Sequence, residues 1–334
     1  MQSSKKKFFF VTGARSEFGQ FSFFLKQLSK IKKIDLSILV TGEHLLKSNG
    51  YTYKDIIKSN LKIKTRINLN INNDNFFSVP NAISVGIKKF NDFFLKNRPD
   101  YLILPCDRFE MLCPAIAGFF LKIPIIHFYG GETSEGSFDN IIRDQISLMS
   151  EYHFVSSDLH KKKLKKIGIK KNIFNIGVLA FDKIKSYKLF NKKYLKKKLK
   201  INFENKTALV TFHPITTNQK TGQRELVNLL KALKKIPNLE VIFTGPNNDP
   251  GSQFIISKIK KLCFEDPKKF KFYSHLGPRL YHSLVSNVDF NIGNSSSLLY
   301  EVPFFGKYSF NIGLRQQGRL AGKSVINIRG DYKQ

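Results

Sequence analysis

The pattern that most constrains the fold is an apolar strand-like run followed by a polar loop and a segment with helical spacing, repeated along the chain. The first example is FFFVT at 8–12, followed by the loop GARSEFGQ and the apolar segment FSFFLKQLSKI. Continuous apolar runs of this length are typical of strands buried on both faces of a parallel sheet. Further runs of this kind lie at 36–42, 60–69, 101–105, 207–214, 239–247, 270–277, 288–296 and 308–316. The sequence therefore predicts an α/β protein with parallel sheets.

The length of the chain and a lysine-rich segment suggest two domains. With 334 residues the chain exceeds what one core normally serves, and 42% hydrophobic residues with 32 Phe are enough to fill two cores. The lysine-rich segment 183–200 is the expected crossing from one series of strands to the next. We predict a doubly wound α/β domain over 1–182 and a second over 183–334, with the ligand in the cleft between them.

The strongly positive charge does not by itself identify a partner. Lysine and arginine number 56 against 25 acidic residues, which gives a formal net charge of +31. Such a charge suits nucleic acid, an anionic membrane or acidic small ligands. Most of the excess is lysine spread over helix-like segments such as 161–166 and 192–200, as expected of solvated faces, whereas nucleic-acid binders gather arginine with aromatic residues on one surface. We therefore expect neither nucleic acid nor a membrane as partner.

The cysteines and the apolar runs bear on the cellular compartment. Cys106, Cys113 and Cys263 lack metal-binding spacing and cannot all form disulfides, so we expect a reduced cytoplasm and no metal site. The N-terminal run FFFV is too short for a signal peptide and is predicted to be a strand. No uninterrupted apolar segment is long enough to span a bilayer.

The stretch VDFNIGNSSSLLYEV at 288–302 has the pattern of an anion site. A strand that enters a helix through small residues leaves backbone N–H groups and the positive end of the helix dipole facing outward, where a phosphate can bind. Ser295 and Ser296 add hydroxyl donors, and Glu301, on the helix that follows, can accept from sugar hydroxyls. The same residues are equally compatible with an N-capping serine cluster beside a solvated glutamate.

Polar side chains also follow the predicted strands of the first domain. Arg15 follows the first strand and precedes a helix, which suits a diphosphate, or a plain surface turn. Asp107 and Arg108 follow YLILP, and Glu132 and Asp139 follow IIHFYGG. Because loops after parallel strands emerge at one edge of the sheet, we expect these groups to be neighbours, and two carboxylates there can serve as acid and base. A strand-end ion cluster without a catalytic role is the alternative.

Three histidines and two loops complete the polar set. His127 lies inside an apolar strand and is expected to be a hydrogen-bonded core residue. His213 and His275 each follow a strand, and either can hold a phosphate or transfer a proton near neutral pH, although a strand-end histidine is usually structural. Arg315 in the loop RQQGR can contact a diphosphate, and Asn248 in PNNDPG can contact a base or phosphate. Both loops are also compatible with plain solvated turns.

Taken together, these motifs resemble the hydrolysing branch of the UDP-N-acetylglucosamine 2-epimerase family. The matching segments run in order from Val11 to Ile326 and include VTGARSEFG, LPCDRFEML, IIHFYGGETSEGSFDNIIRDQISLMS, VTFHPIT, SHLG, GNSSSLLYEV and NIGLRQQGR. The resemblance implies two Rossmann-like domains of the GT-B type, a cytoplasmic homodimer or homotetramer, and no metal or redox cofactor. It also implies a reaction that eliminates UDP to leave a glycal and then adds water to release the 2-epimer. From UDP-GlcNAc the products are ManNAc and UDP, which feed sialic-acid-type sugar synthesis.

The resemblance assigns roles by position. It implies a catalytic group of Asp107, Asp139 and His213. It implies UDP contacts at Arg15, Asn248, His275, Ser295, Ser296, Glu301 and Arg315, with Glu301 on the ribose, and we add Arg108 to this set. Where family members often have Glu or His, this chain has Tyr129, so we expect Glu132, or the hydroxyl of Tyr129, to take that proton-transfer role.

Three further expectations concern the chain end, the substrate and competing functions. The chain stops at Gln334 soon after SVINIRG, so we expect it to lack the terminal helices of its relatives. The expected substrate is UDP-GlcNAc or a UDP-2,4-diacetamido sugar. The alternatives are a GT-B glycosyltransferase, a catalytically impaired nucleotide-sugar-binding protein and a basic nucleic-acid-binding protein.

Overall fold

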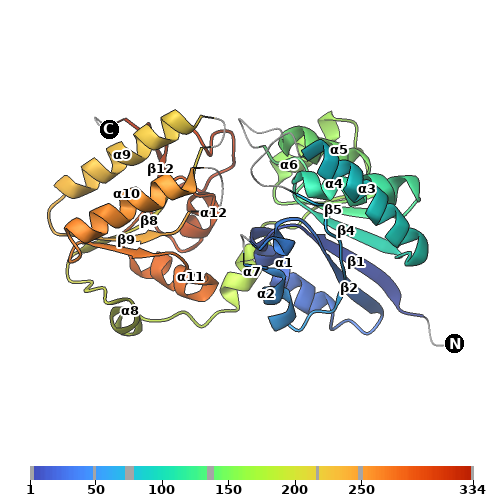
Figure 1. The fold of residues 1–334 in the computed structure, drawn as a ribbon, viewed down its shortest axis with the longest axis horizontal. Coiled ribbons are helices and arrows are strands. Elements are labelled where there is room, and N and C mark those ends of the chain that lie inside the picture. The colour runs from blue at the N-terminus through green and yellow to red at the C-terminus, as the bar shows by residue number, and fades with distance from the viewer. Residues whose placement is uncertain are drawn as a thin grey trace. The chain divides into compact units, whose positions relative to one another are not determined.

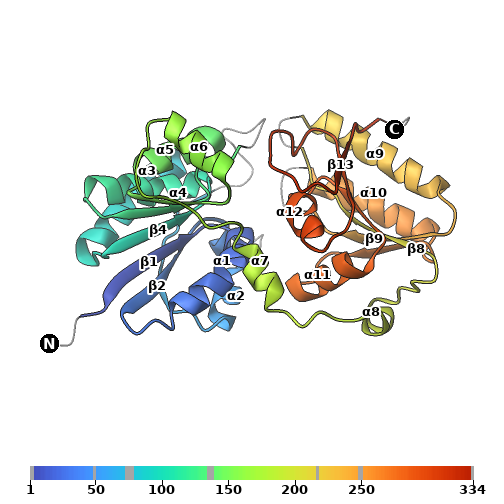
Figure 2. The same cartoon turned by 180° about the vertical axis from the view of Figure 1, so that it is seen from behind.

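The computed structural model describes residues 4–47, 50–71, 79–133, 139–215, 218–246 and 251–331. The chain divides into two compact units: unit 1 holds the described residues up to 133 and from 139 to 183, and unit 2 holds those from 184 onward. Each unit is a parallel sheet with helices on both faces (Figure 1 and Figure 2). The prediction of two Rossmann-like α/β domains with parallel sheets, the building blocks of the GT-B type, is confirmed.

Unit 1 contains a seven-stranded sheet in the order β3-β2-β1-β4-β5-β6-β7. Its strands are β1 (Lys6–Thr12), β2 (Ile34–Val40), β3 (Ile63–Arg66), β4 (Tyr101–Pro105), β5 (Ile125–Phe128), β6 (Tyr152–Val155) and β7 (Ile173–Asn175). Its helices are α1 (Arg15–Leu28), the 3-10 helix η1 (Gly42–Leu45), α2 (Tyr53–Lys58), α3 (Val79–Lys96), α4 (Phe109–Phe120), α5 (Asp139–Leu148) and α6 (Asp158–Lys166). Helix α7 (Ala180–Lys185) spans the point at which the two units divide.

Both faces of the first sheet are buried, which accounts for the unbroken apolar run in β1. Phe9 and Val11 join a core formed with α3 and α4, whereas Phe10 joins the core formed with α1 and α2 on the opposite face. Because successive side chains of a strand point to opposite faces, a strand covered on both sides buries nearly all of its side chains, which favours apolar residues.

Unit 2 contains a six-stranded sheet in the order β10-β9-β8-β11-β12-β13. Its strands are β8 (Lys206–Thr211), β9 (Leu239–Thr244), β10 (Phe270–Tyr273), β11 (Phe290–Gly293), β12 (Ser309–Ile312) and β13 (Val325–Ile328). Its helices are α8 (Lys192–Leu199), α9 (Gln219–Lys235), α10 (Ser252–Glu265), α11 (Pro278–Asn287) and α12 (Ser297–Phe304). Val210 of β8 packs with α9 and α10, and Leu209 packs on the other face with α8, α11 and α12. Figure 2 shows α12 beside β13.

Two strands differ from the sequence prediction. The strand expected over 60–69 is only Ile63–Arg66, because the flanking apolar side chains of Leu61 and Leu69 are buried from loop positions without joining the ladder. The strand β13 was not predicted, since it is a four-residue edge strand with Ile326 43% exposed. In the described part of the chain, no helix combines the length and apolar character that crossing a membrane requires.

Candidate active site

Each sheet has one point at which the chain order of its strands reverses. In unit 1 this point lies between β1 and β4, and in unit 2 it lies between β8 and β11. In open parallel sheets, ligands bind outside the carboxyl ends of the two strands at such a point, where the loops diverge. The residues that follow β1 and β4, and those that follow β8 and β11, therefore form the candidate site of each unit.

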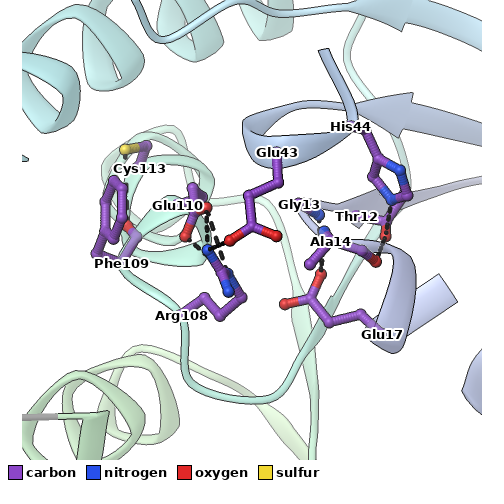
Figure 3. A network of polar contacts seen from close by, with 10 residues as sticks. All are labelled: Thr12, Gly13, Ala14, Glu17, Glu43, His44, Arg108, Phe109, Glu110 and Cys113. Carbon is purple, nitrogen blue, oxygen red and sulfur yellow. Dashed lines mark hydrogen bonds and ion pairs between the residues drawn. The ribbon is translucent and has the colours of Figure 1, made fainter. Parts of the chain in front are cut away.

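The loop after β1 is shaped by the side chain of Glu17. Its Oε2 accepts hydrogen bonds from the backbone N–H of Gly13 at 2.8 Å and of Ala14 at 3.1 Å (Figure 3). Its Oε1 is buried without a hydrogen-bond partner among the described residues, and burial raises the pKa of Glu17 to about 7. Arg15 begins α1 and has its Nε 3.3 Å from Asp55 Oδ2 on the exposed surface. An exposed ion pair is worth about 0–1 kcal/mol, so it would compete little with a bound anion.

Arg108, after β4, lies among carboxylates. Its Nη2 donates to Glu110 Oε1 at 2.8 Å and to Glu43 Oε1 at 2.7 Å, and its Nε donates to Glu110 Oε2 at 3.1 Å (Figure 3). Glu110 is fully buried, so this arginine provides most of the compensation for its burial. Arg108 is one of the predicted UDP contacts. In the structure, a phosphate would have to share its guanidinium with these two carboxylates.

Asp107, the other charged residue after β4, is ion-paired with Arg143 of α5. Only 2% of the Arg143 side chain is exposed. Its Nη1 also donates to the carbonyl oxygen of Glu132 at 2.6 Å and to Asn140 Oδ1 at 2.8 Å. One buried guanidinium therefore ties Asp107 to the backbone of Glu132, which confirms that these strand ends are neighbours. Asp139 begins α5, one helical turn before Arg143.

The carboxylate of Glu132 is held by a short chain of hydrogen bonds. Ser156 Oγ donates to Glu132 Oε1 at 2.7 Å and lies 2.9 Å from Nδ1 of His160. Burial, with the positive charges of Arg143 and Lys163, lowers the pKa of His160 to about 4, so its ring is neutral at pH 7. A neutral ring with its proton on Nδ1 donates to Ser156, which leaves the serine hydroxyl directed at Glu132.

Tyr129 and His127 occupy buried positions. The Tyr129 hydroxyl accepts a hydrogen bond from the backbone N–H of Leu179 at 2.9 Å, and burial raises the pKa of Tyr129. This hydroxyl is therefore a poor proton acceptor or donor for a substrate. His127 is fully buried, with Nδ1 2.9 Å from Ser147 Oγ and Nε2 2.7 Å from the carbonyl oxygen of Cys106, which confirms its prediction as a core histidine.

In unit 2, the ends of β8 and β11 are joined by the side chain of Asn294. The backbone N–H of His213 donates to Asn294 Oδ1 at 2.6 Å, and Asn294 Nδ2 donates to the carbonyl oxygen of His213 at 2.9 Å. Gly293 precedes Asn294 with φ of 141°, and a Cβ there would lie 1.9 Å from the carbonyl oxygen of Thr211. The two strand ends are therefore in direct backbone contact, which only glycine permits.

The side chain of His213 is buried. Burial, with the charge of Arg315, lowers the pKa of His213 to about 3. At neutral pH the ring is therefore uncharged and a weak base, so proton transfer by His213 is disfavoured. Arg315 also contacts this region: its Nη1 donates to the carbonyl oxygen of Asn294 at 3.1 Å and its Nε to that of Pro214 at 3.3 Å.

The three serines lie at the start of α12, as the anion-site pattern requires. Ser296 is the N-cap residue, and Ser295 Oγ accepts from the backbone N–H of Ser297 at 3.4 Å and from its hydroxyl at 3.1 Å. The Ser297 hydroxyl also lies 2.6 Å from the hydroxyl of Tyr281 on α11. The helix presents its N-terminal end beside Arg315, which makes this end of unit 2 electropositive.

The remaining predicted residues have different positions. Glu301 lies on the second turn of α12, and its Oε2 is 3.4 Å from His282 Nε2. His275 is exposed after β10, at the far edge of the second sheet. Asn248 lies outside the described residues. In the described part of the chain, no group of three or more His, Cys, Asp and Glu side chains is placed to hold a metal ion.

The family model of UDP-N-acetylglucosamine 2-epimerase matches residues 26–334. The chain belongs to the UDP-N-acetylglucosamine 2-epimerase family. A GDP/UDP-N,N'-diacetylbacillosamine 2-epimerase (hydrolyzing) of Campylobacter jejuni is 37% identical over 325 residues, which are 97% of this chain and 84% of that protein. The polysialic acid biosynthesis protein P7 of Escherichia coli is 35% identical over 325 residues, 97% of this chain and 82% of that protein.

Solved structures of other proteins share the fold of this epimerase-family chain. The UDP-GlcNAc 2-epimerase of Neisseria meningitidis bound to UDP-GlcNAc superposes with a TM-score of 0.77 at 18% identity, covering 91% of this chain and 82% of that one. The S. aureus MnaA structure with UDP gives a TM-score of 0.79 at 16% identity, covering 98% of this chain and 85% of that one. At these identities the likeness establishes the fold.

Three residues of this epimerase-family chain were not singled out from the sequence. Arg143 has one usable signal, since it lies four residues after Asp139 and so on the same helix face. Asn294 directly follows the strand-ending Gly293, but its two backbone bonds to His213 depend on a strand 81 positions earlier in the sequence. His282 gives no signal, because it is one polar residue within an otherwise ordinary amphipathic helix.

Proposed function

We propose that the protein is a hydrolysing UDP-sugar 2-epimerase that acts on a UDP-2,4-diacetamido sugar or on UDP-GlcNAc. The observation that carries this proposal is the 37% identity with a hydrolysing diacetylbacillosamine 2-epimerase over almost the whole chain. A second relative of that description, from Legionella pneumophila, is 32% identical over 328 residues, while a UDP-N-acetylglucosamine 2-epimerase of Neisseria meningitidis serogroup B is 29% identical over 329 residues. The diacetamido sugar is therefore the first substrate to test.

The reaction develops opposite charges on the sugar ring and on UDP. When the bond from C1 of the sugar to the diphosphate oxygen breaks, positive charge develops on the ring and negative charge on UDP. A base removes the proton from C2, which yields a 1,2-glycal and UDP. Water then adds its oxygen to C1, and a proton returns to C2 on the opposite face. The net reaction consumes one water and releases UDP and the free 2-epimer.

We assign the proton transfers at C2 to the carboxylates of unit 1. Asp107 and Glu132 are linked through Arg143, and Asp139 begins the same helix as that arginine. Glu132 takes the proton-transfer role expected at the position of Tyr129, because the hydroxyl of Tyr129 is buried and already accepts a hydrogen bond. Two carboxylates near one carbon allow one to accept the proton and the other to deliver it.

We assign UDP to unit 2. Ser295, Ser296 and the N-terminal end of α12 suit the diphosphate, with Arg315 beside them. Glu301 suits the ribose hydroxyls. Arg15, whose ion pair with Asp55 is exposed, is a further proposed diphosphate contact. His213, neutral and buried, is proposed to orient the substrate by hydrogen bonding rather than to carry a proton.

The remaining assignments rest on fewer observations. Arg108, His275 and Asn248 stay predicted nucleotide contacts. A homodimer or homotetramer and a cytoplasmic location also stay predictions, and light scattering of the purified protein tests the first of them.

The test is to incubate UDP-diacetylbacillosamine and UDP-GlcNAc separately with the protein and to follow UDP release and sugar identity by NMR. We expect UDP and a free 2-epimer from one or both substrates, and strong loss of turnover in Asp107→Asn. Asp100→Asn is the matched control, because Asp100 is a carboxylate outside the candidate site whose partners are Lys6 and the backbone N–H of Lys7. Unchanged substrate at high enzyme concentration would contradict the proposal.

A further inference from the structure

The carboxylate proposed for the ribose has a neighbour that no sequence motif indicates. Helix α11 packs beside α12 in unit 2 (Figure 1). Nε2 of His282 on α11 lies 3.4 Å from Oε2 of Glu301 on α12. Of the two side chains, His282 is 8% exposed and Glu301 is 23% exposed, so the histidine lies behind the carboxylate, away from solvent.

Aromatic rings enclose the imidazole of His282. Tyr187 stacks on it at 5.9 Å between ring centroids with 30° between planes, Tyr281 meets it edge-on at 5.6 Å, and Phe305 lies at 6.2 Å. Burial and the negative charge of Glu301 raise the pKa of Tyr187 to about 12, which is consistent with the carboxylate lying against this group of rings. Among the described residues, the carboxylate of Glu301 is the charged group that lies within ion-pair distance of the imidazole.

Packing alone does not explain why the residue at this position is a histidine. Its Nδ1 is buried and has no hydrogen-bond partner among the described residues. An unsatisfied buried polar atom costs stability, and a leucine or phenylalanine would fill the same aromatic surroundings without that cost. The compensating feature is the proximity of Nε2 to Glu301. With a proton on Nε2, the imidazole presents an N–H toward the carboxylate of Glu301.

We propose that His282 is a positioning residue that holds the carboxylate of Glu301 in the orientation needed to accept hydrogen bonds from the two hydroxyls of a ribose. The site is thereby selective for nucleotides that carry a vicinal diol. The inference rests on the proposed function, in which Glu301 binds the ribose. A glutamate side chain has three rotatable bonds, and fixing it before the ligand arrives lowers the entropy cost of binding. With His282 holding Oε2 from the buried side, the remaining lone pairs of the Glu301 carboxylate face the diol.

The test compares UDP with 2′,3′-dideoxy-UDP as ligands of the full chain by calorimetry. For wild-type protein we expect UDP to bind about ten-fold or more tightly than the dideoxy analogue, since two hydrogen bonds to a carboxylate are lost. In His282→Phe this preference falls several-fold through weaker UDP binding, while affinity for the analogue is unchanged. In His282→Gln, which retains an N–H donor, the preference is partly restored.

Two further variants separate positioning from general damage. Tyr281→Phe removes the neighbouring hydroxyl that contacts Ser297, so it can weaken both ligands but leaves their ratio at the wild-type value. In a Glu301→Gln background, His282→Phe should have no additional effect on the ratio, because the histidine acts through that carboxylate. If His282→Phe folds poorly, His282→Leu replaces it in both backgrounds, since leucine also suits the aromatic surroundings.

The outcomes distinguish the inference from the proposed function. A wild-type ratio in a well-folded His282→Phe protein, or effects of the two substitutions that simply add, would overturn the role of His282 while leaving UDP binding intact. Failure of the wild-type protein to bind UDP would overturn the proposed function and the inference with it. Equal binding of the two ligands by wild-type protein would overturn the ribose role of Glu301 and the role of His282, but not UDP binding itself.

Discussion

His213 and Asn294 hold each other at the switch point of the second sheet: the backbone N–H of His213 donates to Asn294 Oδ1, and Asn294 Nδ2 donates back to the His213 carbonyl oxygen. The pair joins the ends of β8 and β11, and the Asn294 carbonyl oxygen in turn accepts from Arg315 and Gln316. One fully buried residue therefore fixes the loops that carry the proposed diphosphate contacts, through its side-chain amide and its backbone carbonyl oxygen.

The Asn294→Asp variant tests this relationship with almost no change in shape. An aspartate can still accept from His213 but cannot donate, so the His213 carbonyl oxygen loses its partner and a negative charge is placed beside the proposed phosphate site. We expect the free energy of unfolding to fall by about 1–3 kcal/mol and UDP affinity to fall markedly. Urea unfolding and calorimetry measure the two effects.

Asn287→Asp is the matched control for this prediction. Asn287 also donates through its Nδ2, to the carbonyl oxygens of Ser283 at 2.7 Å and Phe190 at 3.3 Å, but it lies at the end of α11 away from the strand ends. It should lose stability with little change in UDP affinity. If both variants bind UDP equally well, Asn294 does not shape the nucleotide site.

Gly293→Ala is predicted to be severe because the close approach of β11 to β8 leaves no room for a side chain. The added Cβ would lie 1.9 Å from the Thr211 carbonyl oxygen, at a φ of 141° that only glycine adopts readily. We expect a loss of about 3 kcal/mol or more and displacement of the serine loop. Gly19→Ala in α1 is the control: nothing lies within 4 Å of its Cβ, so it should stabilise the protein by about 0.5–1 kcal/mol. Equal thermal shifts in the two variants would show that the close approach at Gly293 is not limiting.

Arg143→Met is predicted to destabilise unit 1 by about 3–5 kcal/mol, since it removes one partner of a buried ion pair and leaves Asp107 uncompensated. Arg143→Lys keeps the charge but not the fork that reaches Asp107, Asn140 and the Glu132 carbonyl oxygen, so it should be more stable yet still strongly impaired in turnover. Urea unfolding and the NMR assay of UDP release measure the two effects.

Arg98→Met is the control for the arginine prediction. Arg98 is exposed and donates to the carbonyl oxygen of Lys122 at 2.9 Å, so its replacement should cost about 1 kcal/mol and leave turnover unchanged. Arg143→Lys with wild-type turnover would show that Arg143 does not position the carboxylates.

The stability of the protein should fall as the pH is lowered below neutral. Burial lowers the pKa of four histidines to about 4 and of a fifth to about 3; these are His44, His127, His153, His160 and His213. Between these values and the ordinary 6.5, the unfolded chain binds protons that the folded chain does not. Each histidine therefore removes up to about 1.4 kcal/mol per pH unit over that range.

Two glutamates, Glu17 and Glu225, oppose this trend, because burial raises the pKa of each. The pKa of Glu17 is raised to about 7, so the folded chain holds a proton that the unfolded chain loses above about 4.5, and this contribution is lost as the pH rises through 7. The five histidines outnumber these two glutamates, so the net slope stays positive between pH 4 and 6.5. Urea unfolding at a series of pH values measures it, and equal stability at pH 5 and pH 7 would contradict the burial of these histidines.

The architecture was predictable because its strands are buried on both faces. An unbroken apolar run such as FFFV in β1 is typical of a strand covered by helices on both sides, and the polar residues that follow such runs mark the strand ends where ligands bind. The elements that the sequence did not predict also have physical explanations. Strand β13 is short and partly exposed, so it lacks that run, and the apolar residues Leu61 and Leu69 satisfy burial from loops beside β3.

The internal partners of the site could not be predicted. The sequence indicates that Asp107, Glu132 and Glu301 follow or lie near strand ends, but not that Arg143 or His282 lies behind them. Such pairs join elements far apart along the chain, and their residue types are common on amphipathic helices. Burial also changes chemistry that the sequence leaves open, as in His213, whose low pKa makes it a poor proton carrier.

Exchange of the C2 proton with solvent through a glycal is the step that defines the proposed reaction, and it is tested most directly by the reaction of UDP-diacetylbacillosamine in D₂O followed by NMR. We predict UDP together with a free sugar that carries deuterium at C2 and has the inverted configuration there. Release of a sugar that retains its original proton and configuration at C2 would mean simple hydrolysis and would contradict the proposed epimerisation.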